Sequence, residues 1–459
     1  MARIPQTPIF SWEDIDTSSD LDRLRLVLLA LPDEPVVVAL EKYRGRGRDD
    51  YPVRPTWNAL VAGIVFQHET VASLRRELRR NAELRAMCGF DIHLGAAAVP
   101  SDDAFSRFLK VLLDNLELLD DMFHQLVEQL KEHLPELGRK LAVDGKAIRS
   151  FGRPVADEDN KRLDDRRRDT DADWGRKTYQ GQRSDGTQWE RTSRWFGYKL
   201  HLLVDSVHEL PLAFSVTKAS HGDSPELLKL LDDLDERHRD LRQRAEELSA
   251  DKGYDTTDNI VEPWDTYDIK PLIDIRALWK EDAGKPRVLF GDRADVFLYD
   301  EKGQVYCQSP SERRGEDELR ELFFCGFEKD RQALKYRCPA AAYESSCPGR
   351  AECEANANVG PHGRVIRVPL SKDRRIFTPI ARRTPKWKRG YARRTAVERV
   401  NSRIDQVLGF EQHTIRGKKK MTVRITLALA VMLAMALGRV LIGQKDELRS
   451  FVAPVERAA

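Results

Sequence analysis

The sequence predicts an α/β protein: a mixed sheet flanked by helices, preceded by an all-α N-terminal domain and carrying a cysteine-containing insertion. Apolar residues recur at helical spacing from Trp57 to about Leu137, which predicts the all-α part. Apolar and polar residues alternate over residues 196–202 and 210–216, and this period of two predicts two strands joined by a short hairpin. Five of the six cysteines fall between residues 282 and 375, where neither period continues.

The order of the remaining elements predicts the topology of the sheet. Residues 140–144 are a short apolar run whose polar end is Asp144, and Ser224-Pro225 begins a helix. A further strand ends at Asp251, and the last one, residues 269–273, follows a short helix. This order of strands and helices is that of a ribonuclease H-like fold. In open α/β sheets of this kind, polar groups at strand ends meet at one edge and form the ligand site.

A chain of 459 residues exceeds the usual size of a single core, so two or three domains are expected. We expect a helical domain over residues 1–137, a ribonuclease H-like domain over residues 138–445 and a tail of residues 446–459. Residues 152–194 are charged and poor in apolar side chains, which predicts an exposed insertion in the second domain. Residues 282–375 form the insertion that carries the cysteines.

Charge is unevenly distributed along the chain, although the formal net charge is only +2. Between Lys372 and Arg394, ten Lys or Arg residues occur with a single acidic residue, Asp373. Such a run is most often a solvated surface, but next to the carboxylates described below it is better explained as a contact region for a phosphate backbone. The side chains expected to bind DNA are Arg382, Arg383, Lys386, Lys388, Arg389, Tyr391 and Arg394.

The beginning of the chain and its longest apolar run indicate neither secretion nor a membrane span. Met1-Ala-Arg-Ile-Pro leads directly into polar sequence rather than into an apolar signal segment. The longest apolar run, residues 425–437, is too short to cross a bilayer and is better explained as a buried helix. We therefore expect no membrane partner and a cytoplasmic location, with the protein on the nucleoid when it is bound to DNA.

Three carboxylates form the candidate catalytic set. Asp144 and Asp251 each end a strand-like run, and Glu398 lies in the segment 391–405, whose apolar residues follow a helical period. On that helix Tyr391, Arg394 and Glu398 fall on roughly one face. Two strand-end aspartates and one helical glutamate are the ligands that two-metal phosphoryl transfer requires. Spacing alone does not separate any one of these residues from an ordinary surface acid.

These blocks resemble the DDE transposases of bacterial insertion sequences, in the grouping of families 4, 5 and 1182. Asp144-Gly-Lys, Asp251-Lys-Gly-Tyr and the segment with Tyr391, Arg394 and Glu398 occur in the order found in that group. The helical signature of the family places a Lys seven residues after the Glu, whereas this chain has Asp405. An acid there would repel a DNA phosphate, so that phosphate is either left unbound or held by another cation, of which Arg394 is the best placed.

The resemblance implies that Asp144, Asp251 and Glu398 are catalytic residues and ligands of two Mg²⁺ ions, for which Mn²⁺ can substitute. It implies metal-dependent strand cleavage at the ends of an insertion sequence and strand transfer into target DNA. The implied partners are terminal inverted repeats, target DNA and a second copy of the chain in a homodimer. Residues 99–109 are similar to a segment of the helical N-terminal domain that binds the element's ends in this family. A helical scaffold without DNA contact is the alternative.

Two other functions fit part of the pattern. A ribonuclease H-like nuclease would share the carboxylates but would not need the helical domain or the Tyr/Arg signature. A DNA-binding protein derived from a transposase that has lost catalysis would tolerate changes in the three acids, all of which are present here.

The cysteines of the insertion leave a second question open. Cys307, Cys338, Cys347 and Cys353 could hold one Zn²⁺ ion, but they do not form the C-x-x-C pairs of common zinc sites. Free thiols packed in a small insertion are the competing interpretation.

Overall fold

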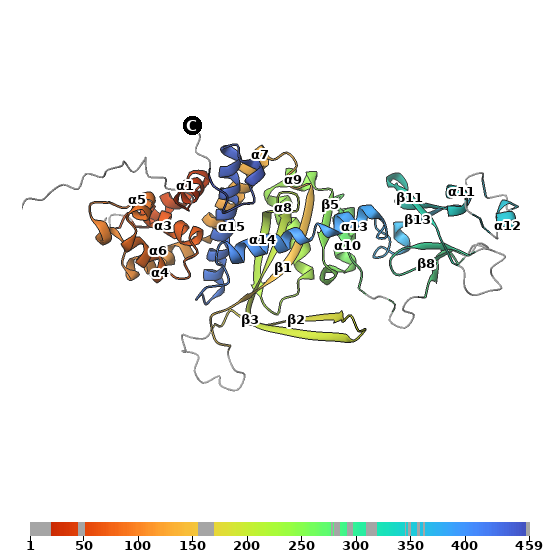
Figure 1. Ribbon diagram of the computed structural model, residues 1–459, viewed down its shortest axis with the longest axis horizontal. Helices are drawn as coiled ribbons and strands as arrows, with labels where there is room; N and C mark the ends of the chain where they lie inside the picture. The colour runs from red at the N-terminus through yellow and green to blue at the C-terminus, as the bar shows by residue number, and fades with distance from the viewer. Residues whose placement is uncertain are drawn as a thin grey trace, which may run out of the picture.

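The computed structural model describes residues 20–44, 51–154, 169–276, 279, 285–291, 297–308, 319–344, 346–347, 350–355, 359–360 and 363–455. The insertions expected at 152–194 and 282–375 and the tail at 446–459 therefore lie partly outside the described residues. Figure 1 shows an elongated molecule, with the N-terminal helices at one end, the main sheet in the middle and the inserted strands at the other end.

Helices make up the described chain before residue 138, as the apolar spacing predicts. Their starts follow from local capping: Thr70 and Ser73 form a capping box, and the Ser101 hydroxyl accepts from the Ala104 N–H. Each helix buries its apolar side against the others. The helices are α1 (Asp20–Ala30), α2 (Glu34–Arg44), α3 (Val53–Val65), α4 (Val71–Arg80), α5 (Ala82–Cys88), α6 (Asp102–Leu113) and α7 (Leu116–His133).

The main sheet has the topology that the sequence predicts. β1 lies at its centre, antiparallel to β3 and parallel to β5, while β4 pairs with β3 and β6 pairs with β5. Three helices, α8 (Ser224–Arg237), α9 (Arg239–Arg244) and α10 (Thr257–Asp265), lie in the connections. The fold is therefore ribonuclease H-like, which confirms the predicted class. The strands are β1 (Lys140–Arg149), β2 (Asp173–Gln182), β3 (Gln188–Asp205), β4 (Leu210–Lys218), β5 (Glu247–Ala250) and β6 (Lys270–Ile273).

Two strands are longer than predicted. β1 continues beyond Asp144 to Arg149 because β3 pairs with it as far as Gly197. β3 begins at Gln188 rather than at Phe196, and its first half pairs with β2 in a hairpin. Most of this hairpin is made of residues expected to form an exposed insertion, and it projects from the sheet in Figure 1. Backbone hydrogen bonds between β2 and β3 hold this hairpin together, and its side chains follow no apolar period. The sequence pattern therefore did not predict it.

The C-terminal part of the chain returns to the sheet through α14 (Thr395–Gln406) and α15 (Lys418–Leu441). α14 packs on β1 and β3 and buries Val397, Val400 and Ile404. α15 lies against α1 and α7, as Figure 1 also shows. Because α15 contacts both parts of the protein, the N-terminal helices and the sheet share one continuous apolar core.

By length and composition α15 alone, within the described part of the chain, could cross a membrane. However, 94% of its most apolar window is buried inside the protein. α1, α3 and α7 cover this surface, so α15 has the properties of the buried helix that the sequence predicts.

The cysteine-containing insertion has its own small sheets and its own core. Buried aromatic residues, including Trp264, Tyr299 and Tyr336, form this second core. α13 (Pro385–Ala392) then leads back to the main sheet and packs on β5 and β6. One inserted sheet consists of β7 (Arg287–Val288), β8 (Phe297–Tyr299), β9 (Val305–Cys307) and β10 (Arg320–Glu321); the other consists of β11 (Phe323–Glu328), β12 (Ala333–Arg337) and β13 (Val365–Pro369), with the short helices α11 (Pro339–Tyr343) and α12 (Arg350–Glu354) after β12.

Candidate active site

Asp144 and Asp251 lie side by side where β1 meets β5. The two strands are parallel and Val143 is opposite Ala250, so Asp144 and Asp251 are the next residues on each strand. The ladder ends there because Asp251 begins a tight turn, in which its Oδ1 accepts a hydrogen bond of 2.6 Å from the Gly253 N–H. The parallel register therefore brings together two acids that are far apart in the sequence.

The surroundings of Asp144 disfavour its charge. Burial raises the pKa of Asp144 to about 6, and the negative charges of Asp251 and Asp223 act in the same direction. Lys177 on β2 and the N–H of Gly145, which lies 2.8 Å from Asp144 Oδ1, oppose this shift. A cluster of acids with too little positive charge around it is a suitable electrostatic environment for a divalent cation.

Glu398 lies on the first turn of α14, and its carboxylate is held by Arg394. The guanidinium donates a hydrogen bond of 2.8 Å to Glu398 Oε1 and lies 5.4 Å from the centre of the Tyr391 ring. Burial works against the charge of Arg394, yet the pKa of Arg394 is raised because Tyr391, Glu398 and Asp251 all favour the charged form. Arg394 is thus an internal counterion for two of the three candidate catalytic acids.

The segment from Tyr391 to Asp405 forms two helices rather than the single helix expected. α13 ends at Ala392 and α14 begins at Thr395. In the turn between them the Arg394 N–H bonds to the Tyr391 carbonyl, and the backbone stays close to helical angles. The signature residues therefore remain near one another, although Tyr391 belongs to α13, where its ring stacks on that of Trp387.

Asp405 contacts the protein itself. Its carboxylate forms an ion pair with Lys146 on β1, and both side chains are largely buried. Glu411 Oε1 lies 3.7 Å from the same ammonium group. Lys146 shares a face of β1 with Asp144, and Asp405 shares a face of α14 with Glu398. The pair therefore connects the strand and the helix that carry two of the candidate catalytic acids.

Asp223 is a charged residue near the strand edge to which the sequence analysis gave no role. It precedes Ser224 and has the appearance of an ordinary helix start, yet its Oδ1 lies 2.9 Å from Lys199 Nζ. It also lies 2.9 Å from the position that a Cβ on Gly145 would occupy, so it contacts the face of β1 opposite to the Asp144 side chain. The glycine after Asp144 is a sequence signal for a close approach, but it does not identify the approaching group.

The basic run is only partly available for DNA. Arg382 is 5% exposed and donates hydrogen bonds to the carbonyls of Ile273 and Ile376. Burial lowers the pKa of Arg382 to about 10. The expectation that Arg382 binds DNA is therefore wrong, because its guanidinium is used inside the protein. Arg383 is half-exposed but pairs with Glu321 at 2.8 Å.

Three cations of the run, Lys386, Lys388 and Arg389, are exposed on α13. Lys386 and Arg389 also line a groove of about 1010 Å³ between α13 and the inserted sheets. Cations beside exposed aromatic rings are suited to bind a nucleic acid whose bases are partly unstacked. Besides these two residues, the groove is lined by the cations Lys270, Lys329 and Arg383, the acids Asp268 and Glu321, and the exposed rings of Phe323 and Tyr343.

The four cysteines considered as zinc ligands are free thiols. Cys338, Cys347 and Cys353 line one small pocket. Burial raises the pKa of the Cys307 thiol to about 12. The charges of the other three thiols act in the same direction, so Cys307 lies near the same pocket. Even so, no three His, Cys, Asp or Glu side chains in the described ranges form a group that could hold a metal ion. The zinc site therefore stays a prediction, as do the free thiols that compete with it.

The same finding applies to the candidate catalytic acids: over the described residues, Asp144, Asp251 and Glu398 do not form a three-ligand group. Arg394 holds Glu398, whereas Asp144 and Asp251 fit a divalent cation because they are adjacent and Asp144 is partly buried. Within the described chain, the hydroxyl of the buried Tyr254 near these aspartates has no hydrogen-bond partner. The structure therefore brings Asp144 and Asp251 together and leaves Glu398 on Arg394, and the metal-ligand role of all three acids stays a prediction.

Ribonuclease H-like sheets with paired aspartates at a strand edge define a class of enzymes that process nucleic acids. Sequence comparison narrows this class, because residues 135–434 match the family model described as the transposase DDE domain. The match begins just before β1, ends within α15 and covers more than half of the chain, so the protein belongs to the DDE transposases. Members of this family act on DNA and generally use divalent metals such as Mg²⁺. No curated protein matches the chain.

Proposed function

We propose that the protein is an active transposase that cleaves DNA strands at the ends of an insertion sequence and joins them to target DNA. The observation that carries this proposal is the pairing of Asp144 with Asp251 at the parallel strand edge. Glu398 on α14, which packs on β1, supplies the third acid. Phosphoryl transfer with two metal ions needs a carboxylate set of this kind.

Asp144, Asp251 and Glu398 would hold the metal ions. Mg²⁺ prefers carboxylate oxygens and keeps several waters, so few protein ligands suffice when a substrate phosphate is present, and Mn²⁺ can replace it. When bound, such ions polarise the scissile phosphate and lower the pKa of the attacking water or 3′-hydroxyl. A DNA phosphate that binds the Arg394 guanidinium would release Glu398 from its present hydrogen bond. Arg394 would thereby couple DNA binding to completion of the site.

DNA would approach the site along α13, on which Lys386, Lys388 and Arg389 are exposed and which leads directly to Arg394. The helical region before residue 138 would bind the ends of the element, and two copies of the chain would act together. We place this activity in the cytoplasm, on the nucleoid.

Strand cleavage of DNA that carries the inverted repeats flanking the gene tests this function. Asp144→Ala, Asp251→Ala and Glu398→Ala should each reduce cleavage by about 100-fold or more, because each removes transition-state stabilisation. Folding and DNA affinity should stay near those of the wild type. Asp240→Ala is the matched control, because Asp240 is an exposed acid on α9 that pairs with Lys131.

Other outcomes would identify the competing functions. Near wild-type cleavage by one of the three variants would remove that residue from the catalytic set. Equal cleavage of repeat-bearing and random DNA by the wild type would indicate a nuclease. Specific binding without cleavage in Mg²⁺ or Mn²⁺ would indicate a DNA-binding protein that has lost catalysis. The departure at Asp405 does not favour this last function, because Asp405 has a partner in Lys146.

A further inference from the structure

The hairpin of β2 and β3 turns away from the main sheet at Gly197. This residue has a φ of 154°, and a Cβ on it would lie 2.1 Å from the carbonyl oxygen of Ile148, so only glycine allows the bend. β3 pairs with β1 on one side of this position and with β2 on the other. In Figure 1 the hairpin runs at a large angle to β1. One glycine therefore sets the direction of the hairpin.

Pairing between the two strands defines the two faces of the hairpin. Residues directly opposite each other in an antiparallel ladder point to the same side, and neighbours along a strand alternate. Odd-numbered residues of β2 and β3 therefore share one face, which we call the site face, and even-numbered residues share the back face. Among the described side chains, those exposed on the site face are Lys177, Tyr179, Trp189 and Arg191, and those exposed on the back face are Trp174, Arg176, Thr178, Gln188, Glu190, Thr192 and Arg194.

The site face is directed toward the candidate catalytic acids. Ser193 and Trp195, which belong to this face, line a pocket of about 410 Å³ together with Lys146 of β1. Lys177 is the residue opposite Ser193, and its charge opposes the rise in the pKa of Asp144. Lys177 therefore lies within electrostatic reach of that acid. The site face begins beside the active-site edge and leads away from it along the hairpin.

Two aromatic rings are open to solvent on the site face. Tyr179 is 45% exposed and Trp189 is 38% exposed. A Cβ on Gly181 would come within 2.6 Å of the Trp189 ring, so this ring rests on the backbone of β2. Rings that are held in place and exposed are suited to stack on unpaired bases. Bases inside a duplex already stack on their neighbours and leave no free face for such rings.

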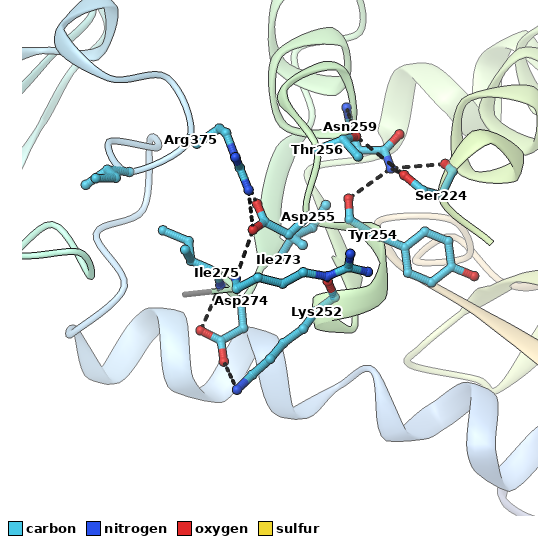
Figure 2. Close-up of polar contacts among 12 residues, drawn as sticks. Ser224, Lys252, Tyr254, Asp255, Thr256, Asn259, Ile273, Asp274, Ile275 and Arg375 are labelled. Carbon is cyan, nitrogen blue, oxygen red and sulfur yellow. Dashed lines mark hydrogen bonds and ion pairs between the residues drawn. The ribbon is translucent and has the colours of Figure 1, made fainter. Parts of the chain in front are cut away.

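Cations around the Asp251 turn are already paired inside the protein, as Figure 2 shows. Arg375 Nη2 lies 2.6 Å from Asp255 Oδ2, and Lys252 Nζ lies 3.4 Å from Asp274 Oδ2. These two basic groups therefore provide little uncompensated positive charge for a ligand.

The cations of the site face differ in this respect. Within the part of the chain that the structure describes, neither Lys177 nor Arg191 forms an ion pair. Lys177 Nζ lies instead 5.9 Å from the centre of the Tyr179 ring. Arg191 is directly opposite Tyr179 in the ladder. Each cation is thus next to an exposed ring, and its charge is available for a phosphate group.

We propose that the site face of the hairpin binds an unpaired strand of the substrate DNA next to the active-site edge. The two rings stack on bases, and the two cations contact phosphates. The strand runs from the vicinity of Asp144 toward the tip of the hairpin. This inference rests on the proposed function, because it names the form of DNA that the same site takes.

Fluorescence anisotropy of the full-length protein tests this inference, with a labelled oligothymidylate either alone or annealed to its complement. A chelator in the buffer prevents cleavage. Tyr179→Ala combined with Trp189→Ala should weaken single-strand binding about tenfold or more, as expected for the loss of two base stacks. Duplex affinity should stay near that of the wild type, and phenylalanine at both positions should restore most of the single-strand affinity.

Trp174→Ala is the matched control, because Trp174 is 57% exposed but lies on the back face of the same hairpin. It should leave single-strand affinity unchanged. Unchanged single-strand affinity in the folded double alanine variant would overturn the inference. An equal loss on single-stranded and duplex DNA would also overturn it, because the rings would then not select unpaired bases.

The salt dependence of single-strand binding tests the two cations. Lys177→Gln combined with Arg191→Gln should reduce the slope of log affinity against log salt by about 0.7 for each phosphate contact that is lost. Arg176→Gln combined with Arg194→Gln is the matched control, since it removes the same charge from the back face. An equal change of slope in this control would show that only the net charge matters, and the inference would fail.

Asp144→Ala separates a failure of this inference from a failure of the proposed function. This variant should lose cleavage and keep its single-strand affinity, because Asp144 is not part of the site face. If the hairpin variants bind single strands as the wild type does while Asp144→Ala abolishes cleavage, only the role of the hairpin is wrong. If the hairpin variants lose single-strand binding but the wild type cleaves no DNA, only the proposed function is wrong.

Discussion

At the scale of single residues, Asp144 shows that a partly buried acid of a candidate active site can oppose the stability of its own fold. Burial raises the pKa of Asp144 to about 6 from an ordinary value of 3.8. The folded protein therefore binds this proton more tightly than the unfolded chain does, and the resulting stability is lost as the pH rises from about 4 to 6. At neutral pH the ionised carboxylate destabilises the metal-free protein.

Asp144→Asn should therefore raise the free energy of unfolding of the metal-free protein by about 1–3 kcal/mol at pH 7.5, while it abolishes cleavage. Urea denaturation in the presence of a chelator measures the difference. The gain should shrink at pH 4.5, because a protonated Asp144 is as neutral as the asparagine that replaces it. A variant that is less stable than the wild type at pH 7.5 would contradict this explanation of the raised pKa.

At the scale of elements, the ion pair between Lys146 and Asp405 connects β1 to α14. Because the family signature has a lysine at this position, the sequence alone predicts that Asp405→Lys leaves cleavage unchanged or raises it. The structure reverses this expectation, because a lysine at position 405 would place two cations against each other in a largely buried contact. Asp405, which departs from the family signature, is thus the partner of Lys146, two residues after Asp144.

Asp405→Lys should lower the free energy of unfolding by about 1–3 kcal/mol and reduce cleavage, since α14 carries Glu398. The exchanged pair, Lys146→Asp with Asp405→Lys, should recover part of both losses. Thermal unfolding and cleavage rates of the two single variants and of the double variant measure these losses and their recovery. Full activity in the Asp405→Lys single variant would mean that the ion pair does not position the helix.

The basic helix α13 carries the second prediction at this scale. Changing Lys386, Lys388 and Arg389 together to Gln should weaken binding to all DNA sequences alike. The slope of log affinity against log salt should fall by about 1 for each phosphate that the variant no longer neutralises. Arg374→Gln is the control, because Arg374 already pairs with Asp265 at 2.6 Å. A weakening restricted to the inverted repeats would indicate that these side chains bind bases rather than phosphates.

At the scale of the whole molecule, α7 and α15 join the N-terminal helices to the catalytic sheet. A buried histidine pair lies at this junction: His124 Nδ1 on α7 is 2.8 Å from Nε2 of His238, which lies between α8 and α9. Burial, and then the neighbouring His238, lowers the pKa of His124 to about 3. The junction is therefore built around a neutral imidazole.

Acid should weaken this junction. The unfolded chain binds a proton at position 124 below about pH 6.5 and the folded protein does not, so stability is lost as the pH falls. Between pH 7 and pH 4.5, the free energy of unfolding of the wild type should fall by about 1–3 kcal/mol relative to His124→Gln. The comparison cancels the opposite contribution of Asp144, which both proteins contain. Parallel pH profiles would contradict the lowered pKa.

The sequence by itself determined the features that depend on local periodicity and on residue type. Helical spacing before residue 138 and the strand order after it were sufficient for the fold class, because a helix or strand buries one face whatever its partner is. Asp144 and Asp251 could be predicted as neighbours, since parallel strands that end in acids bring those ends to one edge. The order of the acidic blocks also indicated a DDE transposase, which the comparison confirmed, while the grouping of insertion-sequence families 4, 5 and 1182 stays a prediction.

Only the tertiary structure decided which charged groups are free and which are already paired. Arg382 and Lys386 belong to the same basic run, yet one is buried against β6 and the other is exposed. The partners of Asp405 and Asp223 come from distant strands. The physical reason is that the pairing of a charge depends on contacts across the fold, whereas periodicity records only which face of its own element a residue occupies.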